Sequence, residues 1–539
     1  MAGIVSGIVF RGATVVDGTG APGRRADVSV RDGRIAAIGP GADGARVVDA
    51  DGLVLAPGFI DMHAHSDVQI LARPDHLAKV SQGVTLEVVG QDGLSYAPVD
   101  DSTLDTLRGQ LAGWNDDPPG FDWNWRTVGE YLDRLDRGIA CNAAYLLPQG
   151  TIRMLAVGYS DRPATESELD TMRMLVATGL AEGALGMSSG LTYTPGMYAT
   201  TDELLALCEV VAAGGGYYSP HHRSYGEGAL DAYAEMIDVS RWSGCPLHLT
   251  HATMNFPVNA GRADELLSLV DSALAAGMEV TLDTYPYLAG ATYLSALLPS
   301  WAAEGGPWAT LVRLSDVVTQ ERIRVDLEER GTDGNHGVPV DWSVITINGV
   351  RLPGNAHLVG LSVAEAARRA GRPPAELYFD VLVAEKLGTS CLMHVGDEDN
   401  VRTIMRHRAH TGGSDGLLVG DRPHPRAWGT FPRYLGHYVR ELGVLGLEEC
   451  VAHLTGRAAR RLRLADRGLV RTGYVADLVL FDPATVAAQA SYDDPRRPAS
   501  GIPYVLVNGV PVIDDGHRTG ALPGHSIRNS SGGRHGSAR

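Results

Sequence analysis

Lysine is almost absent from this chain. Of its 46 basic residues only two are lysines, Lys79 and Lys386. A reaction that used a Schiff-base lysine, or a carboxylated lysine bridging two metal ions, would have to use one of these two. Both occur in stretches with a helical pattern, "DHLAKVSQG" and "VLVAEKLG", and neither stretch is placed for chemistry. The sequence therefore argues against mechanisms based on lysine.

Cysteine is also scarce, and its spacing excludes two further classes of protein. The five cysteines are odd in number, widely scattered, and form no close pair of the metal-binding kind. A disulfide framework or a cysteine-based metal site is therefore not indicated. We expect reduced, mostly buried thiols in a cytoplasmic protein. The cysteines are Cys141, Cys208, Cys245, Cys391 and Cys450.

The chain lacks both a positive charge surplus and a long apolar run at its start. Its net charge of −18 argues against nucleic acid or an anionic membrane as a partner, because both need a basic face. The first residues, "MAGIVSGIVFRGATVVDGTG", contain no basic region followed by a long apolar stretch. We therefore expect neither a signal peptide nor a membrane span.

The two ends of the chain have the same sequence pattern. Residues 1–57 alternate short apolar runs with Asp-Gly turns, a pattern typical of antiparallel β-structure. Residues 461–520 repeat it in "GYVADLVLFDP" and "PYVLVNGVPVIDDG". We predict one small β-sandwich domain built from both termini. Residues 521–539, rich in Gly, Ser and Arg, are expected to form a disordered tail.

The middle of the chain, 58–460, alternates apolar strands such as "GVTLEVVG" with helical stretches such as "TESELDTMRMLVATGLAEG". Repeated strand and helix predict a parallel (β/α)8, TIM-like barrel with its site at the carboxyl ends of the strands. Residues 298–355 interrupt the repeat and are predicted to be an insertion or lid. The fold class is therefore α/β.

Histidines and aspartates follow these predicted strands. In "APGFIDMHAHSD" the side chains of His63 and His65 point to the same side of an extended chain. Such a pair is either a pair of metal ligands or two hydrogen-bonded polar residues at a strand end. Further imidazoles and carboxylates on the same rim favour a metal site, because Zn²⁺ prefers these ligands. They are Asp92, His221, His251 and Asp415.

These motifs, taken together, resemble the amidohydrolase superfamily, and more narrowly the N-acyl-D-amino-acid deacylase (D-aminoacylase) family. The resemblance rests on "APGFIDMHAHSD", "GVTLEVVGQDGLSYAP", "ALGMSSGLTYTPGMYAT", "HHRSYGEG", "GGSDG" and "PHPRAWGTFPRYLG". It covers nearly the whole chain apart from the tail. It implies a β/α barrel joined to a β-sandwich, one or two Zn²⁺ ions, and hydrolysis of an N-acyl amide.

The resemblance also implies roles for single residues. Asp415 of "SDG" corresponds to the general acid and base. Arg426 of "PHPR" and Tyr285 of "YPY" correspond to contacts with a substrate carboxylate, for which a surface ion pair is the structural alternative for Arg426. Tyr193 of "GLTYTPG" is a substrate-binding candidate or a packing residue. The implied metal ligands are His63, His65, Asp92, His221 and His251.

Three positions depart from the family pattern. The family usually has cysteine where this chain has Asp92, lysine where it has Thr253, and serine where it has Ala291. Carboxylate is a harder zinc ligand than thiolate, so the number and identity of the metal ions stay open. The loss of a lysine and a serine leaves open whether the substrate carries a free carboxylate.

Three neighbouring residues have two interpretations each. His222 is expected to pack or hydrogen-bond beside the site rather than to bind metal. Asp283 either orients a metal-binding histidine or is a hydrogen-bonded carboxylate at a strand end. His248 is either a pocket residue or a buried, hydrogen-bonded histidine.

The leading hypothesis is a zinc-dependent hydrolase that cleaves the N-acyl amide bond of N-acyl-D-amino acids or related N-acyl amines. The alternative is an amidohydrolase that acts on a different amide: a cyclic amide, a dipeptide or an acylated natural-product intermediate. A non-catalytic scaffold is a third hypothesis, which the presence of Asp415 beside the histidines disfavours. The sequence does not determine the oligomeric state.

Overall fold

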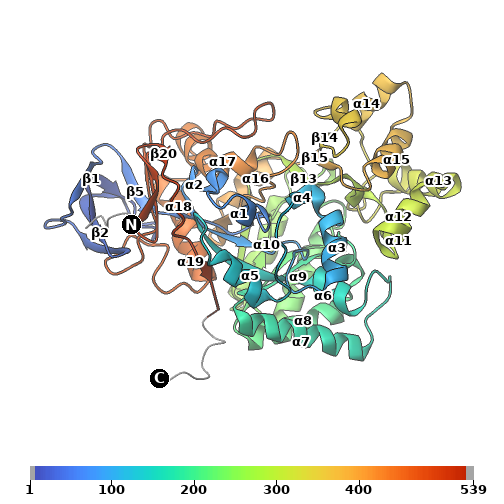
Figure 1. Cartoon of the computed structure of the whole chain (residues 1–539), viewed down its shortest axis with the longest axis horizontal. Coiled ribbons are helices and arrows are strands. Elements are labelled where there is room, and N and C mark those ends of the chain that lie inside the picture. The colour runs from blue at the N-terminus through green and yellow to red at the C-terminus, as the bar shows by residue number, and fades with distance from the viewer. Residues whose placement is uncertain (1–6, 530–539) are drawn as a thin grey trace.

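The computed structural model describes residues 7–529, and its centre is a barrel of eight parallel strands (Figure 1). Its first and last strands meet through Met62 N–H, which donates to the Gly412 carbonyl at 3.0 Å, and Asp415 N–H, which donates to the His63 carbonyl at 2.8 Å. The predicted parallel barrel is therefore confirmed and nearly closed. Its strands are β6 (Phe59–Asp61), β7 (Val84–Val89), β8 (Asn142–Pro148), β9 (Gly186–Gly190), β10 (Tyr217–His221), β11 (Leu247–Leu249), β12 (Val280–Thr284) and β16 (His410–Gly412).

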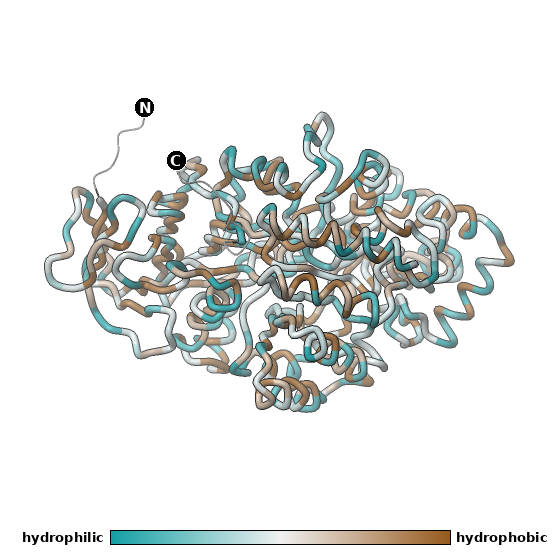
Figure 2. The backbone as a smooth tube through the Cα atoms, turned by 90° about the horizontal axis from the view of Figure 1, so that it is seen from below, coloured by the Kyte–Doolittle hydropathy of each residue, from teal (hydrophilic) through white to brown (hydrophobic). Residues whose placement is uncertain are grey.

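The barrel strands are buried on both faces because helices cover them. Every residue of β7 and of β8 is buried, as expected for parallel strands that read as near-continuous apolar runs. The helix α7 (Glu166–Glu182) begins with a capping box, in which Thr165 and Glu168 each satisfy the backbone of the other. In Figure 2 the outer helices alternate between teal and brown, because one face of each packs on the barrel.

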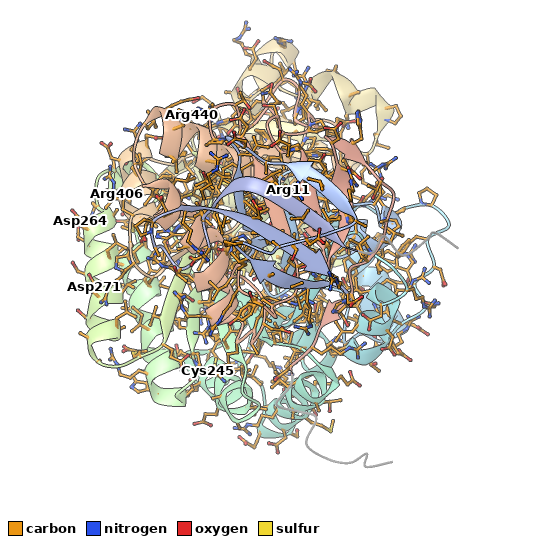
Figure 3. The ribbon with its side chains drawn as sticks, turned by 90° about the vertical axis from the view of Figure 1, so that its left-hand side faces the viewer. Arg11, Cys245, Asp264, Asp271, Arg406 and Arg440 are labelled. Atoms are coloured by element: carbon orange, nitrogen blue, oxygen red, sulfur yellow. The ribbon has the colours of Figure 1, made fainter. Side chains whose placement is uncertain are left out.

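A second sheet joins both ends of the chain, as predicted. The strand β5 (Val54–Pro57) pairs antiparallel with β17 (Leu478–Phe481), so the N-terminal and C-terminal strands form one continuous sheet. Figure 3 looks onto this sheet with the barrel behind it. Its other strands are β1 (Ile8–Val15), β2 (Arg24–Arg31), β3 (Arg34–Ile38), β4 (Arg46–Asp49), β18 (Tyr504–Val507), β19 (Val510–Asp514) and β20 (His517–Arg518).

The insertion between β12 and β16 is longer than the predicted 298–355. It contains a three-stranded antiparallel sheet in the order β13 (Ala289–Tyr293), β15 (Ser390–His394), β14 (Ile345–Gly349). It also has a hydrophobic core of its own, separate from that of the barrel. Its helices stand at the right of Figure 1. They include α11 (Ser300–Ala303), α12 (Gly306–Leu314), α13 (Val317–Val325), α14 (Val363–Ala370) and α15 (Pro374–Ala384).

The first part of the predicted disordered tail is ordered. The strand β21 (Ser526–Ile527) pairs parallel with β8, and Ser526 bonds Asp136 through its N–H at 2.7 Å and its hydroxyl at 3.0 Å. These bonds hold β21 against the barrel. The remainder of the predicted tail, 530–539, lies outside the described residues. Within residues 7–529, no helix has the length and apolar character needed to cross a membrane.

Candidate metal centre

Six polar side chains meet at the carboxyl ends of the barrel strands, where the sequence placed them. They come from five different strands or the loops that follow them. Three of the six, Asp92, His251 and Asp415, have positive φ angles of 53°, 30° and 49°. Residues other than glycine rarely adopt this conformation, and it recurs at functional sites because the surrounding structure enforces it. The six are His63, His65, Asp92, His221, His251 and Asp415.

Asp92 links two groups of ligand atoms. Its Oδ1 lies 3.5 Å from His63 Nε2 and 3.4 Å from His251 Nε2. Its Oδ2 lies 3.5 Å from His65 Nε2 and 3.4 Å from His221 Nδ1. The ligand atoms that lie within reach of one another form two groups that share Asp92: one contains His63, His65, Asp92 and Asp415, and the other contains Asp92, His221 and His251. A carboxylate shared in this way can bridge two cations.

Some of these polar atoms face one another or have no hydrogen-bond partner among the described residues. The Nε2 atoms of His63 and His65 face each other at 3.2 Å, as do His221 Nδ1 and His251 Nε2 at 3.1 Å. Asp92 Oδ1 is buried without a hydrogen-bond partner among the described residues. Neutral imidazole nitrogens and carboxylate oxygens are ligands that zinc accepts. The residues present therefore fit a metal centre.

Burial and neighbouring charges shift the pKa values of the residues in this cluster in different directions. Burial lowers the pKa of His63 to about 4, because nearby carboxylates only partly offset it. Burial acts the same way on His65, but its hydrogen bonds with Asp415 and Asp92 outweigh it and raise its pKa to about 9. Burial would raise the pKa of Asp92, yet the surrounding histidines, His63 first, hold it well below its usual value. The Asp92 carboxylate is therefore ionised.

Asp415 joins the metal-ligand cluster to a buried arginine. Its Oδ1 lies 3.1 Å from His65 Nε2, and its Oδ2 lies 2.9 Å from Arg426 Nη2. Burial alone would raise the pKa of Asp415, but the Arg426 charge and the His65 hydrogen bond keep it below its usual value. Arg426 is fully buried with its guanidinium 4.5 Å from the centre of the Tyr285 ring. The alternative of a surface ion pair for Arg426 is therefore wrong.

A cavity of about 70 Å³ lies over the cluster. Tyr193 and Tyr285 line it, and the Tyr193 hydroxyl lies 3.1 Å from Thr292 Oγ1. Thr253 and Ala291 also line it, and no described lysine does. The structure thus places the predicted substrate residues Tyr193 and Tyr285 at the cavity wall. Their roles in binding remain predictions.

Asp283 and His248, two of the three residues with two interpretations each, lie beside the metal-ligand cluster. Asp283 Oδ1 accepts a bond from His251 N–H at 3.0 Å, and its Oδ2 lies 2.9 Å from His248 Nε2 and 3.9 Å from His63 Nδ1. Asp283 therefore fastens the backbone of one candidate ligand and faces the ring of another. His248, held by Asp283, is a buried, hydrogen-bonded histidine.

His222 lies outside both groups of ligand atoms, as expected. Its ring packs between those of Tyr225 and Tyr233, with centroid distances of 4.0 and 3.9 Å. The aromatic contacts fix its ring beside His221 without bringing it to the cluster.

A buried ion network that was not predicted from the sequence lies beside the centre. Lys79 Nζ lies 2.6 Å from Asp61 Oδ2 and 2.8 Å from Ser414 Oγ, and 3.6 Å from Glu87 Oε2. Asp61 also accepts bonds from His63 N–H at 3.2 Å and Ser414 N–H at 2.8 Å. Lys79 therefore neutralises Asp61, whose carboxylate holds together the loops that carry His63 and Ser414. Lys79 is buried in this structural role, of which its helix-like sequence context gave no sign.

The fold and this cluster define a β/α barrel with a candidate metal centre at the carboxyl ends of its strands. The sequence matches the model of the amidohydrolase family over residues 46–513, and the chain belongs to that family. It is 36% identical to the D-aminoacylase of Alcaligenes xylosoxydans xylosoxydans over 97% of this chain and 98% of that protein.

Two solved structures share the architecture. One is the N-acyl-D-glutamate deacylase of Bordetella bronchiseptica complexed with zinc and a phosphonate inhibitor that mimics the tetrahedral intermediate. It has a TM-score of 0.83 and 33% identity, and the match covers 98% of this chain and 100% of that one. The other is a D-aminoacylase with a binuclear metal centre, with a TM-score of 0.81 and 34% identity over 97% and 99% of the two chains.

Proposed function

We propose that this protein is a zinc-dependent hydrolase that cleaves the N-acyl amide bond of N-acyl-D-amino acids. The observation that carries the proposal is the placement of Asp92 between two groups of metal-ligand atoms, with Asp415 at one edge of the cluster. The near full-length similarity to deacylases of N-acyl-D-amino acids supports the same reaction. The proposal covers one or two zinc ions, because both groups contain at least three ligand residues.

The first group would hold one zinc ion and the second group the other, with Asp92 common to both. Zinc bound there supplies a Lewis acid for the amide carbonyl and lowers the pKa of water from ~15.7 to about 7. Asp415, ionised beside His65 and Arg426, accepts the proton of the attacking water and passes it to the departing amine. The proton transfer matters because an amide nitrogen leaves poorly until it is protonated.

Arg426 is proposed to bind the substrate carboxylate. Its Nη2 contacts Asp415, whereas its Nε and Nη1 are buried with no hydrogen-bond partner within residues 7–529. An arginine binds a carboxylate best through two charged hydrogen bonds. The edge of the Arg426 guanidinium that carries Nε and Nη1 is suited to that role, and the group lies over the ring of Tyr285.

A second candidate function follows from the wall of the cavity. Thr253 and Ala291 stand where a lysine and a serine would reinforce a carboxylate site, and Arg426 already shares its charge with Asp415. These features favour an amide without a free carboxylate, for example a cyclic amide or an acylated natural-product intermediate. The chemistry at the metal centre would be the same.

One experiment separates these functions. Zinc content is measured on the purified protein, and amine release is then followed with N-acetyl-D-amino acids, their L-enantiomers, and N-acetyl amines without a carboxylate. Cleavage of the D-series supports the proposal, whereas turnover of carboxylate-free amides alone supports the second function. Stoichiometric zinc without hydrolysis of any amide would contradict both and revive the non-catalytic scaffold.

We also propose that the protein works in the cytoplasm on a small-molecule substrate. All five cysteines are buried and none forms a disulfide. The net charge of −18 is unfavourable for nucleic acid or an anionic membrane.

A further inference from the structure

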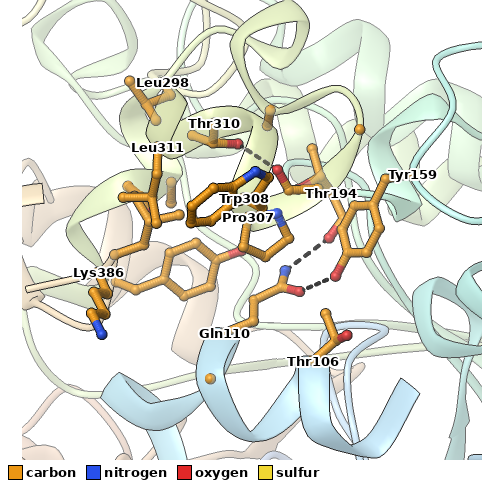
Figure 4. A pocket seen from close by; sticks show the side chains of 18 of the residues that line it. Thr106, Gln110, Tyr159, Thr194, Leu298, Pro307, Trp308, Thr310, Leu311 and Lys386 are labelled. Carbon is orange, nitrogen blue, oxygen red and sulfur yellow. Dashed lines mark hydrogen bonds between the residues drawn. The ribbon is translucent and has the colours of Figure 1, made fainter. Parts of the chain in front are cut away.

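A second, larger cavity lies beside the metal-ligand cluster. Its volume is about 540 Å³, within the range of small-molecule sites, whereas the cavity over the metal ligands is about 70 Å³. The insertion supplies much of its wall, from the hydrophobic segment that begins at β13 and runs into α12 (Figure 4). The apolar side chains that face it are Tyr159, Tyr293, Leu298, Pro307, Trp308 and Leu311.

The polar groups of this wall are paired with one another. Gln110 donates from Nε2 to the Thr194 carbonyl at 2.9 Å, and its Oε1 accepts a bond from the Tyr159 hydroxyl. The hydroxyl of Thr310 donates to the Gly306 carbonyl at 3.0 Å. Figure 4 shows these bonds lying along the wall. The cavity therefore offers mainly aliphatic and aromatic surface, which suits an apolar ligand.

The two cavities adjoin each other. Thr192 lines the larger one, and its Oγ1 lies 2.7 Å from Nε2 of the candidate ligand His221. The next residue, Tyr193, lines the smaller cavity. Likewise, Thr292 lines the smaller cavity and the next residue, Tyr293, lines the larger one. These two segments and Trp114, whose ring packs against His65, Tyr193 and Tyr293, lie between the apolar cavity and the cluster.

The larger cavity and Arg426 lie beside different ends of the metal-ligand cluster. Arg426 contacts Asp415, in the first group of ligand atoms, whereas Thr192 contacts His221, in the second. Asp92 lies between the two groups. A substrate held by its carboxylate at Arg426, with its amide over the cluster, would direct its acyl group toward Thr192.

We propose that the 540 Å³ cavity binds the apolar acyl chain of the substrate, so that the preferred substrates are N-acyl-D-amino acids with medium-length aliphatic or aryl acyl groups rather than N-acetyl compounds. This inference rests on the proposed function and specifies its substrate class. The charged residues of the cavity wall, Asp105, Arg351 and Lys386, are exposed and leave the apolar interior free.

The test is a chain-length series on the zinc-loaded protein, with N-acetyl, N-butanoyl, N-hexanoyl and N-octanoyl derivatives of one D-amino acid. We expect kcat/KM to rise with each added methylene by up to about fourfold, which corresponds to about 0.8 kcal/mol, until the cavity is full. A flat or falling series would overturn the inference while leaving the proposed function intact. Failure of the proposed function would instead appear as no cleavage of any member, N-acetyl included.

Matched variants assign the effect to this cavity. Leu311→Trp fills it, so we expect the advantage of the octanoyl over the acetyl substrate to disappear while N-acetyl turnover is retained. Val312→Trp, on the neighbouring position of the same helix, is exposed and outside the cavity, so the advantage should persist. Ala303→Phe fills the same space from a different helix if Leu311→Trp does not fold. Equal losses for acetyl and octanoyl substrates in a folded filling variant would overturn the inference.

Discussion

Arg426 Nη2 lies 2.9 Å from Asp415 Oδ2, and both residues are buried. One edge of the guanidinium thus stabilises the negative charge of the proposed general base. The atoms Nε and Nη1 have no hydrogen-bond partner within residues 7–529. Under the proposed function the same cation would serve Asp415 and a substrate carboxylate, and it would couple substrate binding to the state of the proposed general base.

Replacing Arg426 with alanine is expected to weaken binding of substrates that carry a carboxylate. Hydrogen bonds to charged groups contribute about 1.5–3 kcal/mol, so KM should rise roughly 10- to 100-fold for N-acyl-D-amino acids. For N-acyl amines without a carboxylate, KM should change little. Arg433→Ala is the control, because Arg433 bonds the Pro286 carbonyl and stacks on Tyr287 away from Asp415. Equal changes in KM for both substrate classes would contradict the role.

Asp415→Asn removes the proposed proton carrier with little change in shape. General acid and base catalysis contributes about 10²- to 10⁴-fold, and we expect kcat to fall by that factor. Zinc content should be largely retained, since the other candidate ligands remain. The measurements are zinc content and kcat on the same preparation, with the exposed Asp421→Asn as control. Near-normal kcat in Asp415→Asn would refute the assignment.

Much of the barrel and its rim could be predicted from local pattern. The repeat of strand and helix placed Asp92, His221 and His251 on the same rim. His63 and His65 lie just after β6, and their Nε2 atoms face each other, in agreement with the predicted placement on one side. These relations depend only on the geometry of single strands and on the parallel arrangement.

Relations that depend on tertiary packing were not predictable. Nothing near "DHLAKVSQG" indicates that Lys79 reaches Asp61 and Ser414, because Ser414 is 335 residues away in sequence. The pairing of β21 with β8 was likewise hidden, since the Gly-, Ser- and Arg-rich composition of 521–539 is typical of disordered chain. The insertion was predicted too short because its sheet forms by pairing of β15 with β13 and with β14, which are distant from β15 in sequence.

Lys79→Met should destabilise the fold and loosen the metal centre. The substitution leaves the Asp61 carboxylate buried without its cation and Glu87 with only His76, and breaking a buried ion pair costs about 3–5 kcal/mol. The other lysine gives a matched control, since Lys386 is exposed and Lys386→Met should have little effect. Urea unfolding measures stability, and zinc retention against a chelator reports on Asp61, which holds the loops of both His63 and Asp415. Unchanged values in Lys79→Met would contradict the role of the network.

The same network predicts a pH dependence of stability. Burial raises the pKa of Glu87, but the charge and hydrogen bond of His76, followed by Lys79, outweigh it and lower the pKa to about 2 from the usual 4.5. A carboxyl group with a lowered pKa stabilises the fold above its unfolded pKa, and this contribution is lost as the pH falls from about 4.5 toward 2.

Glu87→Gln should therefore be less stable than the wild type at pH 7, by about 3 kcal/mol for a shift of this size. The difference in unfolding free energy should shrink below about pH 4.5, because the wild-type carboxyl group then takes up a proton as it unfolds. Urea unfolding of both proteins at several pH values measures the difference, with Glu166→Gln as a control on a side chain that is 79% exposed. A difference that stays constant from pH 7 to pH 3 would show that Glu87 is not held ionised by His76 and Lys79.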